Sequence, residues 1–443
     1  MIPSHRRTSR RAVLASCVLL TGATGCIGDD DPPADDDPAD DDRETDRTDE
    51  PEDDADDADR DDEDISADAD EENDTEDQDD HQLEHPDSWD VDILSESVSH
   101  PWGMALLPGE ESMLLTEREG RLSILDIENG EVDEIAGVPD VYAVRQGGLL
   151  DVELHPEYPE EAWVYLTYSI ENDDGDSATT LGRGWLDLEE LRLTDFEELH
   201  VVEPFQQPAN HYGSRVVFGE DGMVYITSGD RNSKSFGPNH VSQRTDNEIG
   251  TTLRLRPDGS IPSDNPFVDD DDVLDSIFTY GHRNAQGMTV HPESGEVWQS
   301  EHGEEDGDEI NIIEAGGNYG WPIATYSCEY GTEDPIGDEP HERADVVEPV
   351  FYWECTSGGF PPAGMTFYDG DVFPDWDGDL LLGGLAAQYL ARFEVDGREV
   401  LEADPLLAEH EWRIRDVAVG ADTGYIYVCV DSGEGPIARI VPE

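Results

Sequence analysis

Two arginines separated by a single residue are the sequence's clearest candidate for binding an anion. Arg413 and Arg415 flank Ile414, and side chains two positions apart in a strand point to the same face. Guanidinium groups bind carboxylates through paired hydrogen bonds, so the spacing favours an anionic ligand. Ion pairing with acidic neighbours is the alternative, because the chain carries 110 acidic residues against 25 basic ones.

Three histidines are candidates for a general base. His211 lies in the segment Asn-His-Tyr-Gly-Ser-Arg, directly ahead of an alternating apolar stretch. A neutral imidazole there could accept a proton from an alcohol. His282 and His302 are rivals within the polar segment 280–322, and a histidine in a loop also commonly has no role in chemistry.

One acidic loop is a candidate metal site. Residues 303–309 read Gly-Glu-Glu-Asp-Gly-Asp-Glu, and Ca²⁺ prefers about six to eight hard oxygen ligands, including backbone carbonyls. Glycine gives the backbone freedom to wrap around an ion. The alternative is an acidic surface loop, which is also our interpretation of the four aspartates at 269–272, where no glycine turn occurs.

These groups must be positioned by strands, because helical periodicity is scarce after residue 89. A pattern of two alternating apolar strands joined by a Pro- or Gly-containing turn recurs six times, starting at Trp102, Gly147, Gly213, Gln286, Ala363 and Arg415. Six units of roughly 57 residues suit four-stranded blades. The sequence therefore predicts an all-β, six-bladed β-propeller. Candidate residues at the edges of different hairpins would then meet around one axis.

Composition limits the partners and the environment. The formal net charge is −85, and Lys234 is the only lysine in 443 residues. A surface rich in aspartate and poor in lysine is typical of proteins hydrated in concentrated salt, so we interpret the source as a halophile. An acidic cation-binding protein is the alternative. Nucleic acid is excluded as a partner, because the basic patches that bind phosphate are missing.

The N-terminal region predicts export. Residues 1–26 resemble a twin-arginine signal ending in a lipoprotein cleavage box, with Cys26 as the lipidated residue. Residues 27–88 read as a disordered acidic linker, and residues 89–443 as the propeller. The expected location is the outer face of the membrane, lipid-anchored or secreted. No zinc pattern, P-loop, Rossmann fingerprint or nucleophile elbow is present.

Three cysteines remain in the predicted propeller. Cys328 and Cys355 could pair outside the cell. Cys429 lies in an alternating apolar run and is interpreted as a buried small hydrophobe.

Seven segments together resemble the soluble PQQ-dependent aldose dehydrogenases of the glucose/sorbosone type. The resemblance spans residues 98 to 441 and rests on QGGLLDVELHPEY, NHYGSRVVF, GTTLRLRPDGSIPSDNPF, YGHRNAQGM, EHGEEDGDEINIIEAGGNYGWP, PPAGMTFY and RIRDV. It implies that aldose sugars are oxidised at C1 to lactones, with electrons passing to an external or membrane acceptor. The implied cofactors are PQQ and Ca²⁺.

The resemblance also implies roles for particular residues. His211 would remove the C1 hydroxyl proton while hydride passes to the quinone C5, and Asn210 would contact the substrate. Arg283 would stabilise negative charge on the C5 oxygen. The implied cofactor contacts are Gln146, Asn284, Tyr330, Trp353, Arg413 and Arg415.

The resemblance assigns different roles to different residues of the acidic loop. The carbonyl oxygens of Gly303 and Glu304 would hold an ion that polarises the quinone carbonyl, and Glu309 with Tyr319 would form a second site. Glu305 and Asp306 are then expected to be surface acids. The same alignment brings the segments of Cys328 and Cys355 together, which supports their pairing.

Three departures from the family keep other functions open. Glu304 stands where relatives often have proline, Ala386 where they often have a cofactor-binding lysine, and residues 355–359 differ from relatives. A non-catalytic binding propeller is one alternative, with Ala386 as its main support. A calcium-dependent lactonase-type hydrolase is another, against which the Arg413 and Arg415 pair argues.

Overall fold

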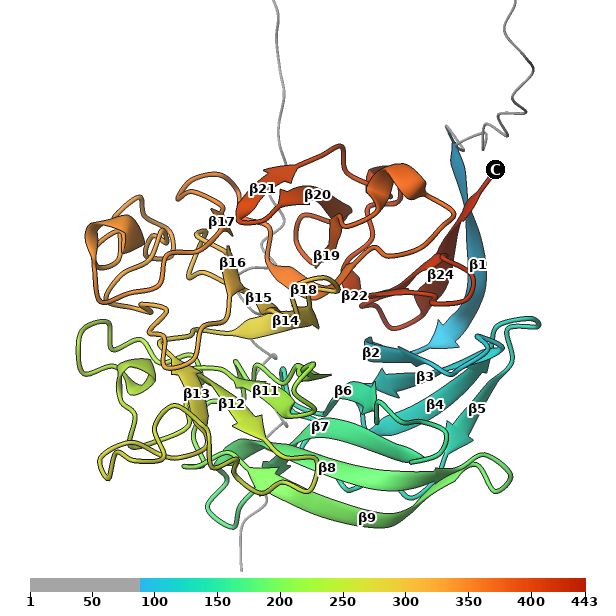
Figure 1. Cartoon of the computed structure of the whole chain (residues 1–443), viewed down its shortest axis with the longest axis horizontal. Helices are drawn as coiled ribbons and strands as arrows, with labels where there is room; N and C mark the ends of the chain where they lie inside the picture. Colours follow the sequence, from blue (N-terminus) through green and yellow to red (C-terminus); the bar gives the residue numbers. More distant parts are fainter. Residues whose placement is uncertain (1–87) are drawn as a thin grey trace, which may run out of the picture. The chain divides into compact units, whose positions relative to one another are not determined.

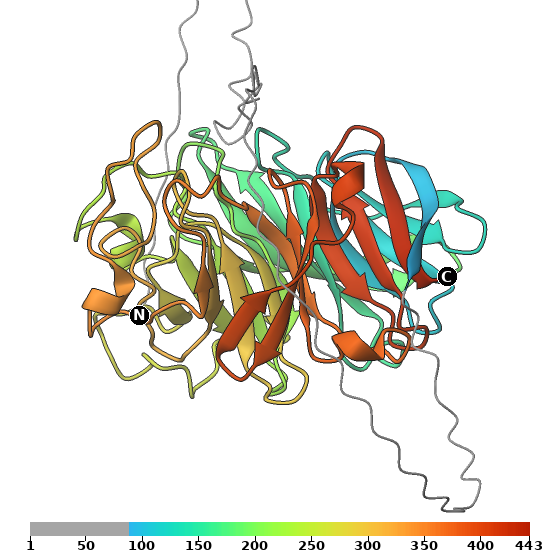
Figure 2. The ribbon, with the colours of Figure 1, turned by 90° about the horizontal axis from the view of Figure 1, so that it is seen from above.

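The computed structural model describes residues 88–443, which form six antiparallel four-stranded sheets around a common axis (Figure 1). The predicted all-β, six-bladed propeller is confirmed. The predicted signal, residues 1–26, and the predicted linker, residues 27–88 except for its last residue, lie outside the described residues. Figure 2, turned by 90° from Figure 1, shows the sheets standing next to one another around the ring.

Each blade is a meander whose first strand lies nearest the axis. Blades 1 to 3 contain β2 (Pro101–Leu106), β3 (Ser112–Glu117), β4 (Arg121–Asp126), β5 (Val132–Ile135); β6 (Leu149–Leu154), β7 (Trp163–Glu171), β8 (Ser177–Asp187), β9 (Arg192–Val201); β10 (Val216–Phe218), β11 (Val224–Ser228), β12 (Thr251–Leu255) and β13 (Ile277–Tyr280).

The second half of the ring repeats this arrangement. Blades 4 to 6 contain β14 (Ala285–Val290), β15 (Val297–Glu301), β16 (Glu309–Ile312), β17 (Phe351–Tyr352); β18 (Pro362–Phe367), β19 (Leu380–Gly384), β20 (Leu390–Asp396), β21 (Glu399–Glu402); β22 (Ile414–Val419), β23 (Ile426–Val430), β24 (Gly435–Pro442) and β1 (Trp89–Val98). Short 3₁₀ turns are η2 (Val241–Gln243), η3 (Pro340–Glu342), η4 (Pro374–Trp376) and η5 (Ala408–His410).

The ring is closed by strands from opposite parts of the sequence. β1 pairs antiparallel with β24, from Trp89 opposite Pro442 to Val98 opposite Gly435. In Figure 1 the blue β1 therefore lies beside the red β24. This pairing hydrogen-bonds the outer edge of β24, so blade 6 is complete only when the first described strand joins it.

All six hairpins expected from the sequence are present as the two inner strands of the six blades. Apolar side chains on alternate positions pack between neighbouring sheets, as where Leu114 and Leu122 of blade 1 meet Leu149 and Val164 of blade 2. The core is therefore a series of layers between blades, and the inner strands surround the axis.

The axis itself is filled by charged groups rather than by apolar ones. Arg215 forms ion pairs with Asp151 at 2.9 Å and with Asp416 at 3.0 Å. The neighbouring inner strand carries Gly364, where a Cβ atom would clash with Asp416. Burial of a guanidinium group requires this compensation, and it ties blades 2, 3 and 6 together below the loops that carry the candidate site.

No helix in residues 88–443 is long and apolar enough to cross a membrane.

Candidate functional site

The segment that carries His211 has an unusual backbone and is held by an arginine. His211 has φ of 50°, a conformation that costs energy for a residue other than glycine and often marks functional sites. Arg231 donates from Nε to the carbonyl oxygen of Asn210 at 2.9 Å and from Nη2 to that of Pro208 at 2.9 Å. Its guanidinium group also lies 3.8 Å from the centre of the Tyr212 ring. Arg231 therefore fixes the loop on both sides of the histidine.

His211 is paired with a buried carboxylate. Its Nδ1 lies 2.7 Å from Oδ1 of Asp230, and the two side chains are 4% and 1% exposed. Burial alone would raise the pKa of Asp230, but His211 and Arg283 hold it below its usual value. The ionised carboxylate accepts a hydrogen bond from Nδ1–H, which leaves the imidazole lone pair on Nε2. Asp230, missed from the sequence, orients the proposed base.

The other two histidines are held by hydrogen bonds, His282 through both ring nitrogens and His302 through Nε2. His282 bonds Glu301 at 3.1 Å through Nδ1 and Thr279 at 2.8 Å through Nε2. His302 donates from Nε2 to the carbonyl oxygen of Pro362 at 2.7 Å. Burial and the positive charge of Arg283 lower the pKa of His302 to about 3, so it stays neutral. His211 is therefore the best candidate for a proton acceptor.

Residues from two neighbouring blades converge on the same loop. Gln146, ahead of β6, accepts from the backbone N–H of His211 through Oε1 at 2.8 Å. Asn284, ahead of β14, accepts from the N–H of Gly213 through Oδ1 at 3.2 Å. The carbonyl oxygen of Arg283 accepts from the N–H of Asp230 at 2.7 Å. The propeller thus brings together residues that are more than 130 positions apart in the sequence, as predicted.

The contacts of Arg415 agree with both interpretations of the pair Arg413 and Arg415, which were binding of an anion and ion pairing with acidic neighbours. Its Nη1 donates to Oε1 of Gln286 and its Nη2 to Oδ2 of Asp431, each at 2.6 Å. Its Nε is buried and has no hydrogen-bond partner within the described residues. Burial lowers the pKa of Arg415, and the nearby guanidinium group of Arg413 acts in the same direction. Clustered cations with an unsatisfied donor fit an anionic ligand such as the PQQ carboxylates.

The side chain of Glu304 is buried, which was not predicted. Its carboxylate accepts from Arg283 Nη2 at 2.9 Å and from Lys234 Nζ, while only 4% of the side chain is exposed. The expectation that Asp306 is a surface acid is wrong, since Asp306 is 6% exposed. Gly303 and Gly307 allow the loop to fold back on itself, which draws these acids inward. The aspartates at 269–272 are exposed, as expected.

Oxygen atoms available for a cation occur at both predicted calcium positions. Within residues 88–443, no three His, Cys, Asp or Glu side chains form a metal-binding group. Backbone oxygens are therefore needed at the first predicted site, where the ligands would be the carbonyl oxygens of Gly303 and Glu304. The second predicted site combines Glu309 with Tyr319, so both positions offer hard oxygen donors of the kind that Ca²⁺ binds.

Glu309 and Glu301 form a buried pair of like charges beside a small cavity. They are 5% and 4% exposed, and both accept from Nδ2 of Asn311, at 3.3 and 3.2 Å. Burial and Glu301 raise the pKa of Glu309 well above its usual value. The cavity has a volume of about 10 Å³ and also touches Tyr319, which is room for one ion or water molecule. A cation there would relieve the repulsion.

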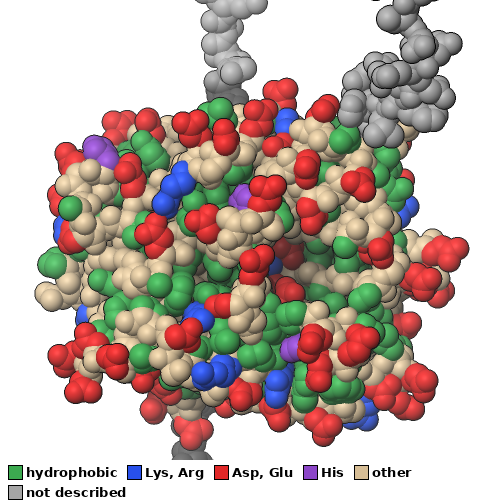
Figure 3. Space-filling model, viewed as in Figure 1, with side chains coloured by type: hydrophobic (Ala, Val, Ile, Leu, Met, Phe, Trp, Pro, Cys, Tyr) green, Lys and Arg blue, Asp and Glu red, His purple; other side chains and the backbone are tan. Residues whose placement is uncertain are grey.

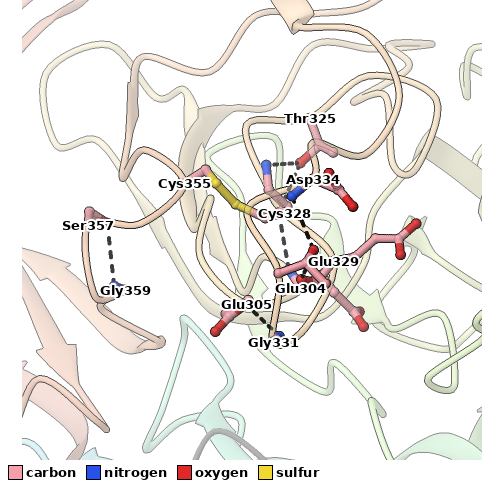
Figure 4. The surroundings of a disulfide bond; sticks show 12 residues. Glu304, Glu305, Thr325, Cys328, Glu329, Gly331, Asp334, Cys355, Ser357 and Gly359 are labelled. Atoms are coloured by element: carbon pink, nitrogen blue, oxygen red, sulfur yellow. Dashed lines mark hydrogen bonds between the residues drawn. A yellow bond between two sulfur atoms is a disulfide. The ribbon is translucent and has the colours of Figure 1, made fainter.

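A disulfide holds the loops around the acidic segment. Cys328 and Cys355 are bonded, with their Cα atoms 5.6 Å apart, so the expected pairing is confirmed. Figure 4 shows the bond next to the loop of Glu304 and Glu305. Cys429 is free and buried, also as expected.

The two predicted aromatic contacts lie in different surroundings. The ring of Tyr330 lies under Lys234, 5.3 Å from Nζ. Trp353 stacks on Phe360, with ring centres 4.7 Å apart, and packs against the core of blades 4 and 5. The backbone N–H of Trp353 donates to the carbonyl oxygen of Asp308, which connects this residue to the acidic loop. The face seen in Figure 3 is hollowed near its centre, and acidic side chains are scattered across it among hydrophobic and other residues.

Comparisons with known proteins agree on one family. The profile described as glucose / sorbosone dehydrogenase matches residues 98–439. The aldose sugar dehydrogenase YliI of Escherichia coli is 37% identical over 357 residues, which cover 81% of this chain and 94% of that protein.

Solved structures give the same result. The apo-form of the soluble aldose sugar dehydrogenase from E. coli superposes with a TM-score of 0.73 at 37% identity, covering 80% of this chain and all of that one. The PQQ-bound aldose sugar dehydrogenase from Streptomyces coelicolor superposes with a TM-score of 0.63 at 25% identity, covering 80% and 99%.

Proposed function

The chain belongs to the glucose/sorbosone dehydrogenase family and is an oxidoreductase, and on this premise we propose that it oxidises aldose sugars at C1 to lactones with bound PQQ and Ca²⁺. The observation that carries the proposal is the buried pair of His211 and Asp230 beside the guanidinium group of Arg283, with Arg283 and Arg415 both close enough to His302 to lower its pKa. A proton acceptor next to clustered cations suits the removal of a proton and a hydride from one alcohol carbon.

His211 acts as the base. Asp230 holds the proton on Nδ1, so Nε2 accepts the proton of the C1 hydroxyl group, and the carboxylate stabilises the imidazolium that results. Asn210, whose carbonyl oxygen is fixed by Arg231, contacts the sugar next to the base. When bound, PQQ supplies the two-electron acceptor for the hydride from C1.

Basic and polar side chains hold the cofactor. Arg413 and Arg415 bind its carboxylates, using donors such as the unsatisfied Nε of Arg415. Gln146 and Asn284, fixed by bonds to the His211 loop, orient it. Arg283 directs positive charge toward the oxygen where negative charge develops. The remaining proposed contacts are Tyr330 and Trp353.

Calcium would bind at two places, one in the loop between β15 and β16 and one at β16 and the segment that follows it. The carbonyl oxygens of Gly303 and Glu304 would hold an ion that supplies Lewis-acid chemistry. Glu309 and Tyr319 would hold a second ion, which would neutralise the buried pair of Glu309 and Glu301.

The N-terminal region determines where the reaction takes place. We propose that residues 1–26 direct export, that Cys26 carries a lipid, and that residues 27–88 tether the propeller outside the membrane. A soluble or membrane-bound acceptor then receives the electrons there.

A single assay tests the activity. The purified protein is loaded with PQQ and calcium in high salt, and reduction of an artificial electron acceptor is followed with several aldoses. Sugar-dependent reduction is expected only when PQQ is present. Binding of PQQ without reduction would favour the non-catalytic propeller, and calcium-dependent hydrolysis of a lactone without PQQ would favour the hydrolase.

A further inference from the structure

The only lysine of the chain pairs with a buried carboxylate at the proposed site. Nζ of Lys234 bonds Oε1 of Glu304. The side chain of Lys234 is 47% exposed, whereas that of Glu304 is 4% exposed. Lys234 lies in the loop between β11 and β12, four residues after Asp230, so one loop supports both the proposed base and this ion pair.

The same carboxylate also bonds Arg283. Oε2 of Glu304 accepts from Nε at 3.3 Å and from Nη2 at 2.9 Å. One negative charge therefore lies between two positive ones, and the three groups together carry one positive charge. Without the lysine, Arg283 and Glu304 would form a neutral pair, and Glu304 would oppose any anion that approaches Arg283.

The positions of the three groups decide which of them can act on the site. Arg283 is 4% exposed, and its guanidinium group lies 5.3 Å from the centre of the Trp321 ring. The indole of Trp321 in turn bonds Asp230 at 2.8 Å, so Arg283 lies beside the base. Lys234 lies on the outer side of Glu304, over the ring of Tyr330. Lys234 therefore acts on Arg283 through the carboxylate of Glu304, which both residues bond.

We propose that Lys234 is a positioning residue, which neutralises Glu304 and so leaves Arg283 as an effective cation toward the anionic cofactor. The inference rests on the proposed function, because it assigns a supporting group to Arg283 within that site. It also gives a role to the one lysine in a chain that otherwise uses arginine for its basic residues.

Charge-removing variants test the inference without any turnover. PQQ is titrated into the calcium-loaded apo-protein, and quenching of tryptophan fluorescence gives the affinity. Lys234→Met is expected to weaken PQQ binding about tenfold. This loss of affinity is smaller than the loss expected for a fully buried ion pair, because Lys234 is half exposed. The double variant Lys234→Met/Glu304→Gln removes both charges and is expected to restore the affinity. Arg398→Met, which removes an exposed cation paired with Glu314, controls for the change in net charge.

Chemical modification gives a second test, because Lys234 is the only side-chain amine. Acetylation removes the lysine charge, whereas reductive methylation keeps it. Acetylated protein should bind PQQ as weakly as Lys234→Met, and methylated protein should bind like the untreated protein. Lys234→Met treated in the same way corrects for reaction at the N-terminus.

The outcomes separate this inference from the proposed function. If the unmodified protein binds PQQ and Lys234→Met binds it equally well, Lys234 has no such role, and the proposed function stands. Weak binding that the double variant does not restore would mean that Lys234 contacts the ligand directly, which overturns the inference. If the unmodified protein does not bind PQQ, the proposed function and this inference both fail.

Discussion

Nδ1 of His211 lies 2.7 Å from Oδ1 of Asp230, and this carboxylate also accepts from Nε1 of Trp321 through Oδ2 at 2.8 Å. The carboxylate is therefore held from two sides and fixes both the tautomer and the ring plane of the histidine. Asp230→Asn keeps the shape but can present its amide N–H to Nδ1, which favours the wrong tautomer. We expect turnover to fall about a hundredfold, with little change in PQQ affinity. Steady-state kinetics beside a PQQ titration checks this, and unchanged turnover would remove the orienting role.

His211→Gln tests the base itself. Glutamine retains a polar side chain but cannot accept and hold a proton near neutral pH, so turnover should fall by about 10²–10⁴-fold. The PQQ affinity should stay within about threefold of the parent value, because the backbone N–H that bonds Gln146 remains. His155→Gln, in the turn between β6 and β7 of blade 2, is the matched control. Turnover that survives in His211→Gln would assign the base to another group.

The sequence was sufficient to place some of these residues and not others. Gln146, His211 and Arg283 precede the inner strands of blades 2, 3 and 4, so their convergence follows from the repeat alone. Their partners depend on loop conformations that no periodicity encodes. Asp230 reaches His211 because the chain turns directly after β11, where Arg231 has φ of 58°.

The burial of Glu304 and Asp306 was not predicted, because the chain is acidic throughout. In a chain with 110 acidic residues, an acid in a loop is most simply assigned to the surface. Asp306 and the side chain of Glu304 are buried because the loop at 303–307 folds back beneath the disulfide-bonded segment (Figure 4). The only lysine, Lys234, was the sequence signal that could have indicated a paired acid at the site, since its partner had to be an acid.

Calcium binding should stabilise the protein through Glu309. The protein with Glu309→Gln loses one of the two buried carboxylates at the small cavity, and with it the charge that favours a divalent cation. Added Ca²⁺ should raise the melting temperature of the parent protein and raise that of the variant far less. Glu293→Gln, an exposed position on blade 4, should respond like the parent. An equal calcium response in Glu309→Gln would place the ion elsewhere.

Loss of the disulfide should destabilise the fold. Cys328 and Cys355 close a loop with a sequence separation of 27, for which chain entropy gives about 3–4 kcal/mol. The double variant Cys328→Ala/Cys355→Ala should have its denaturation midpoint lowered accordingly and should not respond to reductant, whereas the parent protein should. A parent protein whose stability is unchanged by reductant would show that the bond contributes nothing.

Glu153, on the inner strand β6, should make stability depend on pH. Burial, with the nearby charge of Asp151, raises its pKa to about 8 from the usual 4.5, against the smaller effect of a hydrogen bond from the backbone N–H of Leu154. Because the folded state binds the proton more tightly than the unfolded state, the contribution of Glu153 to the free energy of unfolding is complete below pH 4.5. It is lost as pH rises toward 8, at up to about 1.4 kcal/mol per pH unit.

Glu153→Gln removes the ionisation while retaining the shape of the protonated acid. The free energy of unfolding of the variant should therefore exceed that of the parent at pH 8, and the difference should vanish near pH 4.5. Denaturant titrations at the two pH values measure it, with the exposed Glu160→Gln as the control. A variant that is less stable than the parent at pH 8 would show that Glu153 is ionised in the folded protein and stabilised by a cation or by water.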